Sequence, residues 1–171
     1  MNYISRFGLE FNPFTKENKE SLIETTEYKE SIYRLDVLLK TRGFGLLTGS
    51  PGKGKTTIVR NWANNLNPSL YKVIYTTIST LTVNEFYKHL AEQFGLERSF
   101  RKNDNFRIIQ DEITRYTVEK RMTPIIIIDE ANYMKNGILN DLKLLFNFEM
   151  DSKDRAVVLL VGLPQLNNTL R

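Results

Sequence analysis

A ten-residue stretch in the first third of the chain combines side chains and backbone freedom that suit phosphate binding. Residues 48–57 are TGSPGKGKTT, and from Gly49 to Thr56 they fit G-x-x-x-x-G-K-[ST]. The glycines allow the backbone to curl until several N–H groups face one anion. Lys55 would reach the β- and γ-phosphates of ATP or GTP, and the Thr56 hydroxyl would hold Mg²⁺. The predicted nucleotide contacts are Gly49, Ser50, Pro51, Gly52, Lys53, Gly54, Lys55, Thr56 and Thr57.

The residues on either side of this loop favour the same interpretation. A short apolar run, residues 43–47, precedes the loop, and Ile58, Val59, Trp62 and Leu66 follow it at helical spacing. A strand, a glycine loop and a helix in this order form the context in which a phosphate-binding loop occurs. The alternative is a glycine-rich turn with an incidental lysine.

A second group of chemically active side chains ends a strongly apolar run. Ile125 to Ile128 are four consecutive isoleucines, and Asp129 and Glu130 follow them. A carboxylate at the end of a buried strand is costly unless a cation lies close to it. We therefore expect Asp129 to bind Mg²⁺, directly or through water, and Glu130 to orient and deprotonate the attacking water, with Lys55 as its catalytic partner. The alternative is an acidic strand end that only caps a helix.

Hydrophobic periodicity predicts strands that alternate with helices. The isoleucine run indicates a strand buried on both faces, as in the middle of a parallel sheet. The sequence therefore predicts an α/β fold, a parallel sheet with helices on both faces. The expected strands are 43–48, 72–77, 124–129 and 156–161, and the expected helices are 27–41, 54–66, 82–94, 104–120, 136–149 and one that begins near 165.

Length and composition limit the organisation of the chain. Its 171 residues suffice for one domain, which we place at 27–171, after an irregular arm at 1–26. This arm either packs on the domain or forms part of the adenine pocket. The chain has no cysteine, no apolar run near the roughly 20 residues of a membrane span, and no signal-peptide pattern at its start. We expect a cytoplasmic protein with no membrane partner.

Positive charge gathers in one part of the sequence. The net charge is +4, and residues 98–121 hold seven arginines and lysines against four acids. Clustered cations around an aromatic residue, here Phe100, are compatible with contact to nucleic-acid phosphates. The alternative is a solvated helix face. The candidate DNA contacts are Arg98, Arg101, Lys102 and, in the preceding loop, Thr80.

Several segments resemble one family of ATPases. FGLEFNPF, LLTGSPGKGKTT, PIIIIDEAN, LFNFEMDS and LLVGLPQL are similar to segments of the bacterial AAA+ ATPases of the ExeA type. Residues 67–82 look most like the related ATPase helper subunits of transposable elements. The resemblance implies a three-layer P-loop NTPase fold of the AAA+ (ASCE) class, with ATP and Mg²⁺ as cofactors and hydrolysis that is slow without a partner. It also implies a homo-oligomer, a ring or a filament, that assembles on double-stranded DNA and directs a transposase.

The chain departs from this family in two places. Relatives commonly have G-Q-P after the fourth strand, where a polar side chain senses the γ-phosphate, but this chain has Leu163 there. The family's fifth strand and small helical lid find no counterpart before Arg171, so we expect a domain truncated at its C-terminus. Two alternatives follow, an ExeA-like ATPase of secretion or pilus assembly and a nucleotide-binding module that does not hydrolyse ATP.

Three smaller predictions concern residues around the expected site. Thr76 or Thr77, at the end of the second strand, could hold Glu130 inactive by a hydrogen bond. Arg155 and Arg171 are candidates for a cation that stabilises the transition state. A single histidine, His89, is expected on the solvated side of its helix.

Overall fold

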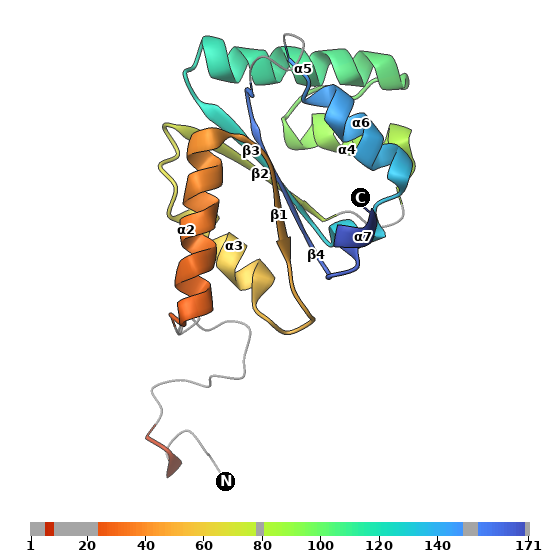
Figure 1. Ribbon diagram of the computed structural model, residues 1–171. Helices are drawn as coiled ribbons and strands as arrows, with labels where there is room; N and C mark the ends of the chain where they lie inside the picture. Colours follow the sequence, from red (N-terminus) through yellow and green to blue (C-terminus); the bar gives the residue numbers. More distant parts are fainter. Residues whose placement is uncertain (1–5, 9–23, 78–80, 149–153, 170–171) are drawn as a thin grey trace.

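A four-stranded parallel sheet forms the centre of the molecule (Figure 1). The computed structural model describes residues 6–8, 24–77, 81–148 and 154–169. The order of the strands across the sheet is β1-β4-β3-β2, and all three neighbouring pairs are parallel. The strands are β1 (Gly43–Thr48), β2 (Tyr71–Thr77), β3 (Thr123–Asp129) and β4 (Val157–Gly162).

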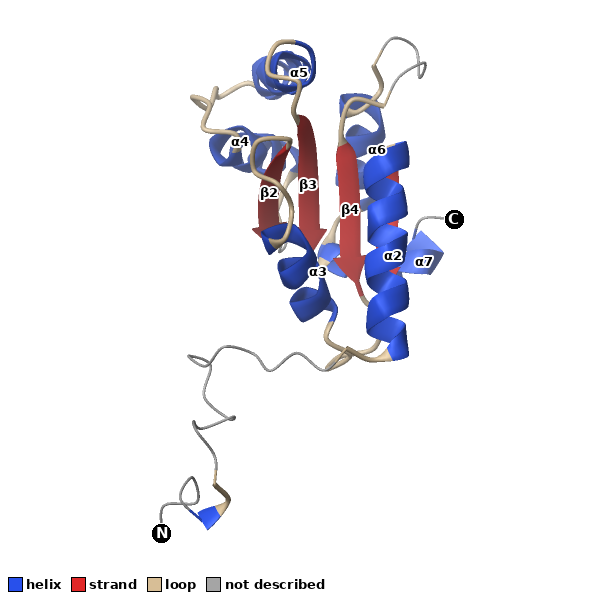
Figure 2. Cartoon of the chain, turned by 90° about the vertical axis from the view of Figure 1, so that its left-hand side faces the viewer, coloured by secondary structure: helices blue, strands red, loops and turns tan. Residues whose placement is uncertain are grey.

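Helices cover both faces of this sheet, so the expected three-layer architecture is confirmed. Helices α2 and α3 lie on one face and α4, α5 and α6 on the other, while the strands run in one direction between them (Figure 2). No helix of the described segments is both long and apolar enough to cross a membrane. The helices are α2 (Thr26–Thr41), α3 (Lys55–Asn64), α4 (Val83–Gln93), α5 (Lys102–Val118), the 3₁₀ turn η1 (Ala131–Tyr133), α6 (Asn136–Leu145) and α7 (Leu166–Thr169).

The isoleucine run of β3 supplies both halves of the core. Successive strand residues point to opposite faces, so Ile125 and Ile127 pack with Val59 and Trp62 beneath α2 and α3. Ile126 and Ile128 belong to the larger cluster beneath α4, α5 and α6, and all residues of β3 are buried. Burial on both faces makes β3 a rigid support for the residues at its carboxyl end.

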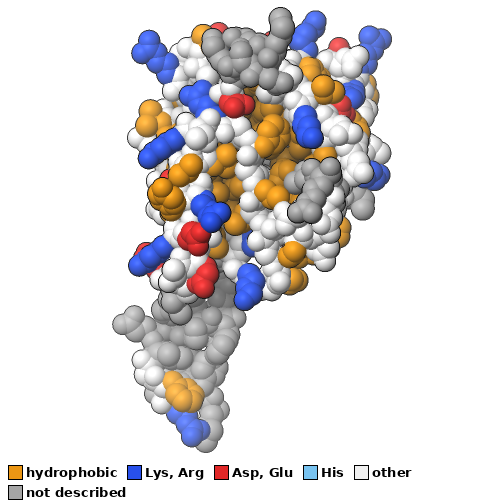
Figure 3. All heavy atoms as spheres, in the orientation of Figure 1, with side chains coloured by type: hydrophobic (Ala, Val, Ile, Leu, Met, Phe, Trp, Pro, Cys, Tyr) orange, Lys and Arg blue, Asp and Glu red, His pale blue; other side chains and the backbone are white. Residues whose placement is uncertain are grey.

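Strand β1 is the edge of the sheet on one side, and this edge is apolar. Phe44 and Leu46 are 47% and 41% exposed. Hydrophobic side chains gather in a hollow at the centre of this face, between α2 and α6 (Figure 3). Within the described residues, no strand pairs with the outer edge of β1.

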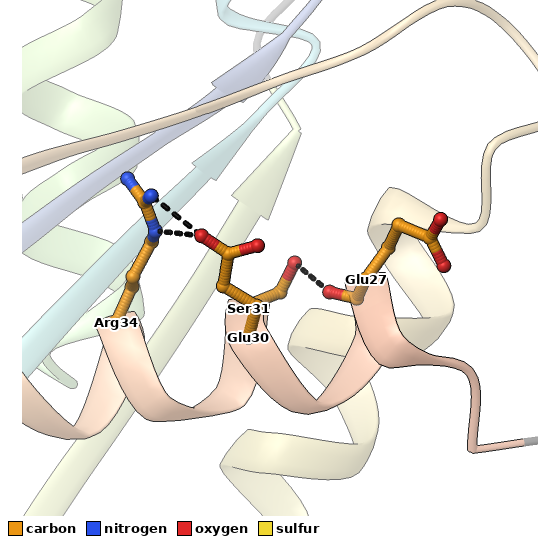
Figure 4. Close-up of polar contacts among 4 residues, drawn as sticks. All are labelled: Glu27, Glu30, Ser31 and Arg34. Carbon is orange, nitrogen blue, oxygen red and sulfur yellow. Dashed lines mark hydrogen bonds and ion pairs between the residues drawn. The ribbon is translucent and has the colours of Figure 1, made fainter.

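The outer face of α2 satisfies its own polar groups (Figure 4). Arg34 donates two hydrogen bonds to one carboxylate oxygen of Glu30, one turn earlier, and Ser31 donates to the carbonyl of Glu27 at 2.7 Å. Pairs at this spacing on an exposed helix stabilise it by only about 0.2–0.5 kcal/mol each.

Helix α6 ends four residues earlier than its apolar pattern predicts. It terminates at Leu145, and both Phe146 and Phe148 are buried in the core cluster beyond it. Residues two apart do not share a helix face, so a continued helix could not bury both rings. The chain leaves the helical conformation to place them.

Candidate nucleotide-binding site

The predicted phosphate loop joins the carboxyl end of β1 to α3 and is open to an anion. Gly52 and Gly54 have φ values of 76° and 74°, a region that side chains disfavour. The Gly49 N–H donates to the carbonyl of Gly162 at 3.2 Å, which anchors the loop to β4. No side chain caps the start of α3 and its first turn has no acid. The free N–H groups and the positive end of the helix dipole therefore face the loop.

Lys55 folds back over this loop. Its ammonium donates to the carbonyls of Gly49 at 2.8 Å and Ser50 at 3.2 Å. These neutral carbonyls leave the positive charge of Lys55 without an ionic partner among the described residues. A polyanion in the loop would offer this ammonium stronger, charge-assisted hydrogen bonds.

Thr56 and Asp129, which lie 73 positions apart in the sequence, meet beside the loop. The Thr56 hydroxyl donates to Oδ2 of Asp129 at 2.9 Å, and Asp129 is only 4% exposed. Hydroxyl and carboxylate oxygens are the ligand types that Mg²⁺ prefers. No group of three or more acids, histidines or cysteines within the described residues could hold a metal alone. The pair therefore fits a Mg²⁺ ion that also takes phosphate oxygens as ligands, as is usual for this ion.

A third residue of this constellation, Tyr75, was not predicted from the sequence. The Tyr75 hydroxyl donates to Oδ2 of Asp129 at 2.7 Å. Burial, the hydrogen bond to Asp129 and the charge of Asp129 raise the pKa of Tyr75 to about 12. The phenol therefore stays protonated and remains a donor at neutral pH. The one signal in the sequence was the alternating pattern of β2. It places the side chain of Tyr75 on the opposite face of the sheet from Ile74 and Thr76.

Glu130 leaves the strand as expected. Its backbone is in the left-handed region (φ 55°, ψ 33°) and its side chain is exposed, while its N–H donates to Oδ1 of Asp129 at 2.8 Å. The Thr76 alternative is wrong, because Thr76 is buried on the α4 face and its hydroxyl lies 2.6 Å from Nε2 of His89. His89 is half-buried and makes this contact with the sheet, so the expectation that it lies on the solvated side of its helix is also wrong. Thr77 ends β2 with its side chain exposed.

The turn after β4 is fixed by an amide rather than by a phosphate-sensing side chain. Oδ1 of Asn132 accepts a hydrogen bond from the Leu163 N–H at 3.1 Å, and Leu163 is half-buried. In α7, Nδ2 of Asn167 lies 3.5 Å from the hydroxyl of Thr48, directly before the loop. A polar side chain on this side of the loop therefore comes from Asn167, and both Asn167 and Gln165 are exposed.

Arg155 lies at the amino ends of the strands, whereas the phosphate loop lies at their carboxyl ends. It precedes the amino end of β4, donates to the hydroxyl of Thr114 at 2.7 Å and lies over the Phe148 ring. It therefore cannot stabilise charge at the site of its own chain. The other candidate, Arg171, lies outside the described residues.

Two cations of the basic stretch neutralise buried acids. Lys102, which lies before the predicted helix at 104–120, is the first residue of α5, and its ammonium lies 2.8 Å from the buried carboxylate of Asp141. Arg115 makes two hydrogen bonds to Glu112, which is also buried. Helix α5 begins earlier than predicted because the fully buried Asn105 ties its first turn to the backbone of Ser99.

The remaining candidate DNA contacts differ in their surroundings. Arg98 pairs with Glu92 at 3.8 Å, and both side chains are exposed. Arg101 is exposed, and within the described residues no side-chain partner is found for it. Phe100, between them, is 91% exposed. Thr80 lies outside the described residues.

A parallel sheet whose carboxyl edge joins a glycine loop, a lysine, a threonine and an acidic strand end defines a P-loop NTPase fold of the AAA+ type. Residues 37–170 match the model of the AAA domain family, and the chain belongs to this family. It is 30% identical, over 99% of its own length, to General secretion pathway protein A of Aeromonas hydrophila. This similarity supports the predicted AAA+ ATPase of the ExeA type.

Solved structures of low sequence identity share the fold. They include Cdc6p from Pyrobaculum aerophilum (17% identity, TM-score 0.68, 91% of this chain and 44% of that one). The Aeropyrum pernix ORC2 protein in ADPNP and ADP complexes also matches (17%, 0.64, 90% and 44%). A Drosophila ORC bound to AT-rich DNA and Cdc6 matches more distantly (11%, 0.56, 85% and 49%). The chain spans 31% of the length of the Aeromonas relative and less than half of these structures.

Proposed function

We propose that this chain binds ATP with Mg²⁺ and hydrolyses it to ADP and phosphate. The observation that carries this proposal is the hydrogen bond between Thr56 and Asp129 beside an uncapped helix and a glycine loop. Residues 49–57 bind the phosphates through backbone N–H groups, and Lys55 turns its ammonium from the loop carbonyls to the phosphates. Mg²⁺, held by Thr56 and Asp129, neutralises charge on the phosphate oxygens when it is bound.

Glu130 is the proposed base of this reaction. Its exposed carboxylate stands beside the site, and the hydrogen bond from its own N–H to Asp129 ties its backbone to the metal-binding residue. It orients the attacking water and accepts a proton from it. Leu163 supplies no hydrogen bond to phosphate from its side chain, and the amide of Asn167 lies 3.5 Å from the hydroxyl of Thr48, directly before the loop. We therefore expect slow turnover.

Measurements of ATP binding and of phosphate release separate the role of Glu130 from the roles of the nucleotide-binding residues. Glu130→Gln should bind ATP as tightly as the parent chain but release phosphate at least about 100-fold more slowly, the usual effect of losing a general base. Glu119→Gln is the matched control, because Glu119 follows α5 at the opposite edge of the sheet. ATP binding without any phosphate release by the parent chain would contradict hydrolysis and favour a nucleotide-binding module. Absence of ATP binding would contradict the proposal as a whole.

We further propose that the ATP-bound protein forms a homo-oligomer on double-stranded DNA and regulates a transposase. The resemblance of residues 67–82 to transposon helper subunits motivates the transposase, and the exposed Arg98 and Arg101 supply cations. A fold neighbour, Drosophila ORC, is seen bound to DNA. The matching experiment measures duplex binding with ATP, with ADP and without nucleotide, followed by target selection with the partner transposase.

The variant that tests the DNA surface removes both arginines. Arg98→Ala with Arg101→Ala should lower the slope of log Kobs against log salt by about 1.8, or about 0.9 for each lost phosphate contact. Lys40→Ala, an exposed lysine in the last turn of α2 on the other face of the sheet, should not change the slope. Duplex binding that does not depend on salt or on these arginines would overturn the assignment of this surface.

A role in secretion or pilus assembly is the second candidate. The observation in its favour is the 30% identity to General secretion pathway protein A. In that case turnover would not respond to duplex DNA, and no nucleotide state would bind DNA. The duplex-binding experiment therefore also separates the two candidates.

A further inference from the structure

The carboxylate of Asp129 receives three hydrogen bonds, which come from three different parts of the chain. Thr56 and Tyr75 donate to Oδ2 at 2.9 and 2.7 Å, and the Glu130 N–H donates to Oδ1 at 2.8 Å. The carboxylate is buried, and no lysine or arginine of the described segments forms an ion pair with it. These three donors therefore hold its charge and its orientation.

The register of the sheet explains how Tyr75 reaches Asp129. Thr77, not Tyr75, lies beside Asp129 in the pairing of β2 with β3, and Tyr75 lies beside Ile127. Two strand residues span about 6.6 Å, a distance that a tyrosine side chain leaning along the strand covers with its hydroxyl. Alternation directs Tyr75 to the same face as Val73, which packs beneath α2 and α3, and Thr56 is in the first turn of α3.

Packing does not account for this tyrosine. Its side chain is 42% exposed, whereas its neighbours Ile74 and Thr76 are 3% exposed. A residue needed mainly to fill the core would be buried further. The side-chain hydrogen bond found for Tyr75 among the described residues runs from its hydroxyl to Asp129.

We propose that Tyr75 is a positioning residue that orients the Asp129 carboxylate toward the Mg²⁺ of the bound nucleotide. This inference rests on the proposed function. An ionised carboxylate has about four acceptor positions, and the chain's own donors occupy three of them, which leaves one for the metal or its water. Thr56 has a single hydroxyl proton, so its hydrogen bond to Asp129 leaves its lone pairs for the metal. Tyr75 keeps the carboxylate from rotating out of this arrangement.

If Tyr75 had the opposite role, its removal would change the metal affinity in the opposite direction. If Tyr75 only blocked Asp129 in the nucleotide-free protein, its hydroxyl would compete with the metal, and removing it would tighten metal binding. If Tyr75 positions Asp129, removing the hydroxyl weakens metal binding. Partners that orient a ligating carboxylate typically contribute 10–100-fold to metal affinity.

The test compares Tyr75→Phe with Tyr71→Phe in the full chain. Tyr71 is on the same strand and face and is half-buried, and no hydrogen bond of its hydroxyl is found in the described residues, so it is a matched loss of one hydroxyl. Mn²⁺ binding to the protein–ADP complex is measured by electron paramagnetic resonance. ADP affinity is measured by fluorescence of a labelled analogue, with Mg²⁺ and with excess EDTA.

Tyr75→Phe should raise the Kd for Mn²⁺ by about tenfold and leave the EDTA-measured affinity for ADP within about twofold. Tyr71→Phe should change neither. Unchanged or tighter Mn²⁺ binding in Tyr75→Phe would overturn the inference. A parent chain whose ADP binding gains nothing from metal would instead contradict the proposed function.

A second background isolates the route through Asp129. In Asp129→Asn, adding Tyr75→Phe should weaken Mn²⁺ binding by less than about twofold, because coupled residues do not contribute independently. A further tenfold loss in this background would show that Tyr75 acts on the metal by another route and would overturn the positioning role. Thermal unfolding of each variant without nucleotide confirms that the comparison is made between folded proteins.

Discussion

Two regions carry similar kinds of charged residues but use them differently. One is the carboxyl edge of the sheet, where the strands end, and the other is the surface around the start of α5, residues 98–115, which we call the α4–α5 surface. Among the described residues at the carboxyl edge, Lys55 has only backbone carbonyls as partners and Asp129 has only neutral donors. On the α4–α5 surface, Lys102 neutralises Asp141 and Arg115 neutralises Glu112. Charge that stays unneutralised beside a glycine loop indicates a ligand site, whereas charge density in a sequence does not.

The largest expected effect lies at the carboxyl edge. Lys55→Ala should weaken ATP binding by about 100-fold, because hydrogen bonds from a charged donor to an ionised acceptor stabilise a complex by up to about 3 kcal/mol. Lys143→Ala, an exposed lysine in the last turn of α6, should leave the affinity unchanged. Isothermal titration measures both, and equal affinities would remove the contrast between the two regions.

On the α4–α5 surface, the loss of Lys102 should affect folding before it affects binding. Lys102→Met leaves Asp141 buried without its cation, and we expect the free energy of unfolding to fall by about 1 kcal/mol, a value reduced for the partial exposure of the lysine. Denaturant unfolding provides the measurement, with Lys143→Met as the control. Unchanged stability together with lost duplex binding would assign Lys102 to DNA instead.

In contrast to Lys102, the loss of Arg101 should affect DNA binding and not folding. Arg101→Ala removes no side-chain partner of the described residues, so stability should stay constant while the salt slope of duplex binding falls by about 0.9. Fluorescence anisotropy at several salt concentrations gives this slope. A destabilised Arg101→Ala would mean that the whole surface is structural.

The smallest effect concerns the start of α4. Glu85 and Thr82 form a capping box, and hydrogen bonds from the backbone and the hydroxyl of Thr82 lower the pKa of the Glu85 carboxyl. Because its pKa is lowered in the folded state, the ionised Glu85 carboxylate stabilises the fold at pH values above the ordinary pKa of a glutamate. This stabilisation is lost as the pH falls through the folded-state pKa. The small stability difference between the parent chain and Glu85→Ala should therefore shrink at acid pH, as thermal unfolding across pH can show.

Local patterns were sufficient for most of the fold and for the centre of the candidate site. Strand β1 has the predicted bounds, Gly43–Thr48. Thr56 and Asp129 were predicted to bind the same Mg²⁺, and in the structure they are joined by a hydrogen bond. These features follow from backbone propensity and from burial on two faces, both of which act over a few neighbouring residues.

Which polar side chains become partners depends on contacts that form only in the folded chain. The hydrogen bond from Tyr75 to Asp129, the contact of Thr76 with His89 and the pairing of Lys102 with Asp141 join distant segments. Each depends on strand register and on how far a side chain reaches across packed elements, which residue types and spacing do not encode. The AAA+ fold and the position of the predicted phosphate loop could be inferred from residue patterns, because glycines and buried strands act locally. The assembled sheet determines how the Asp129 carboxylate is held, because its three donors meet only there.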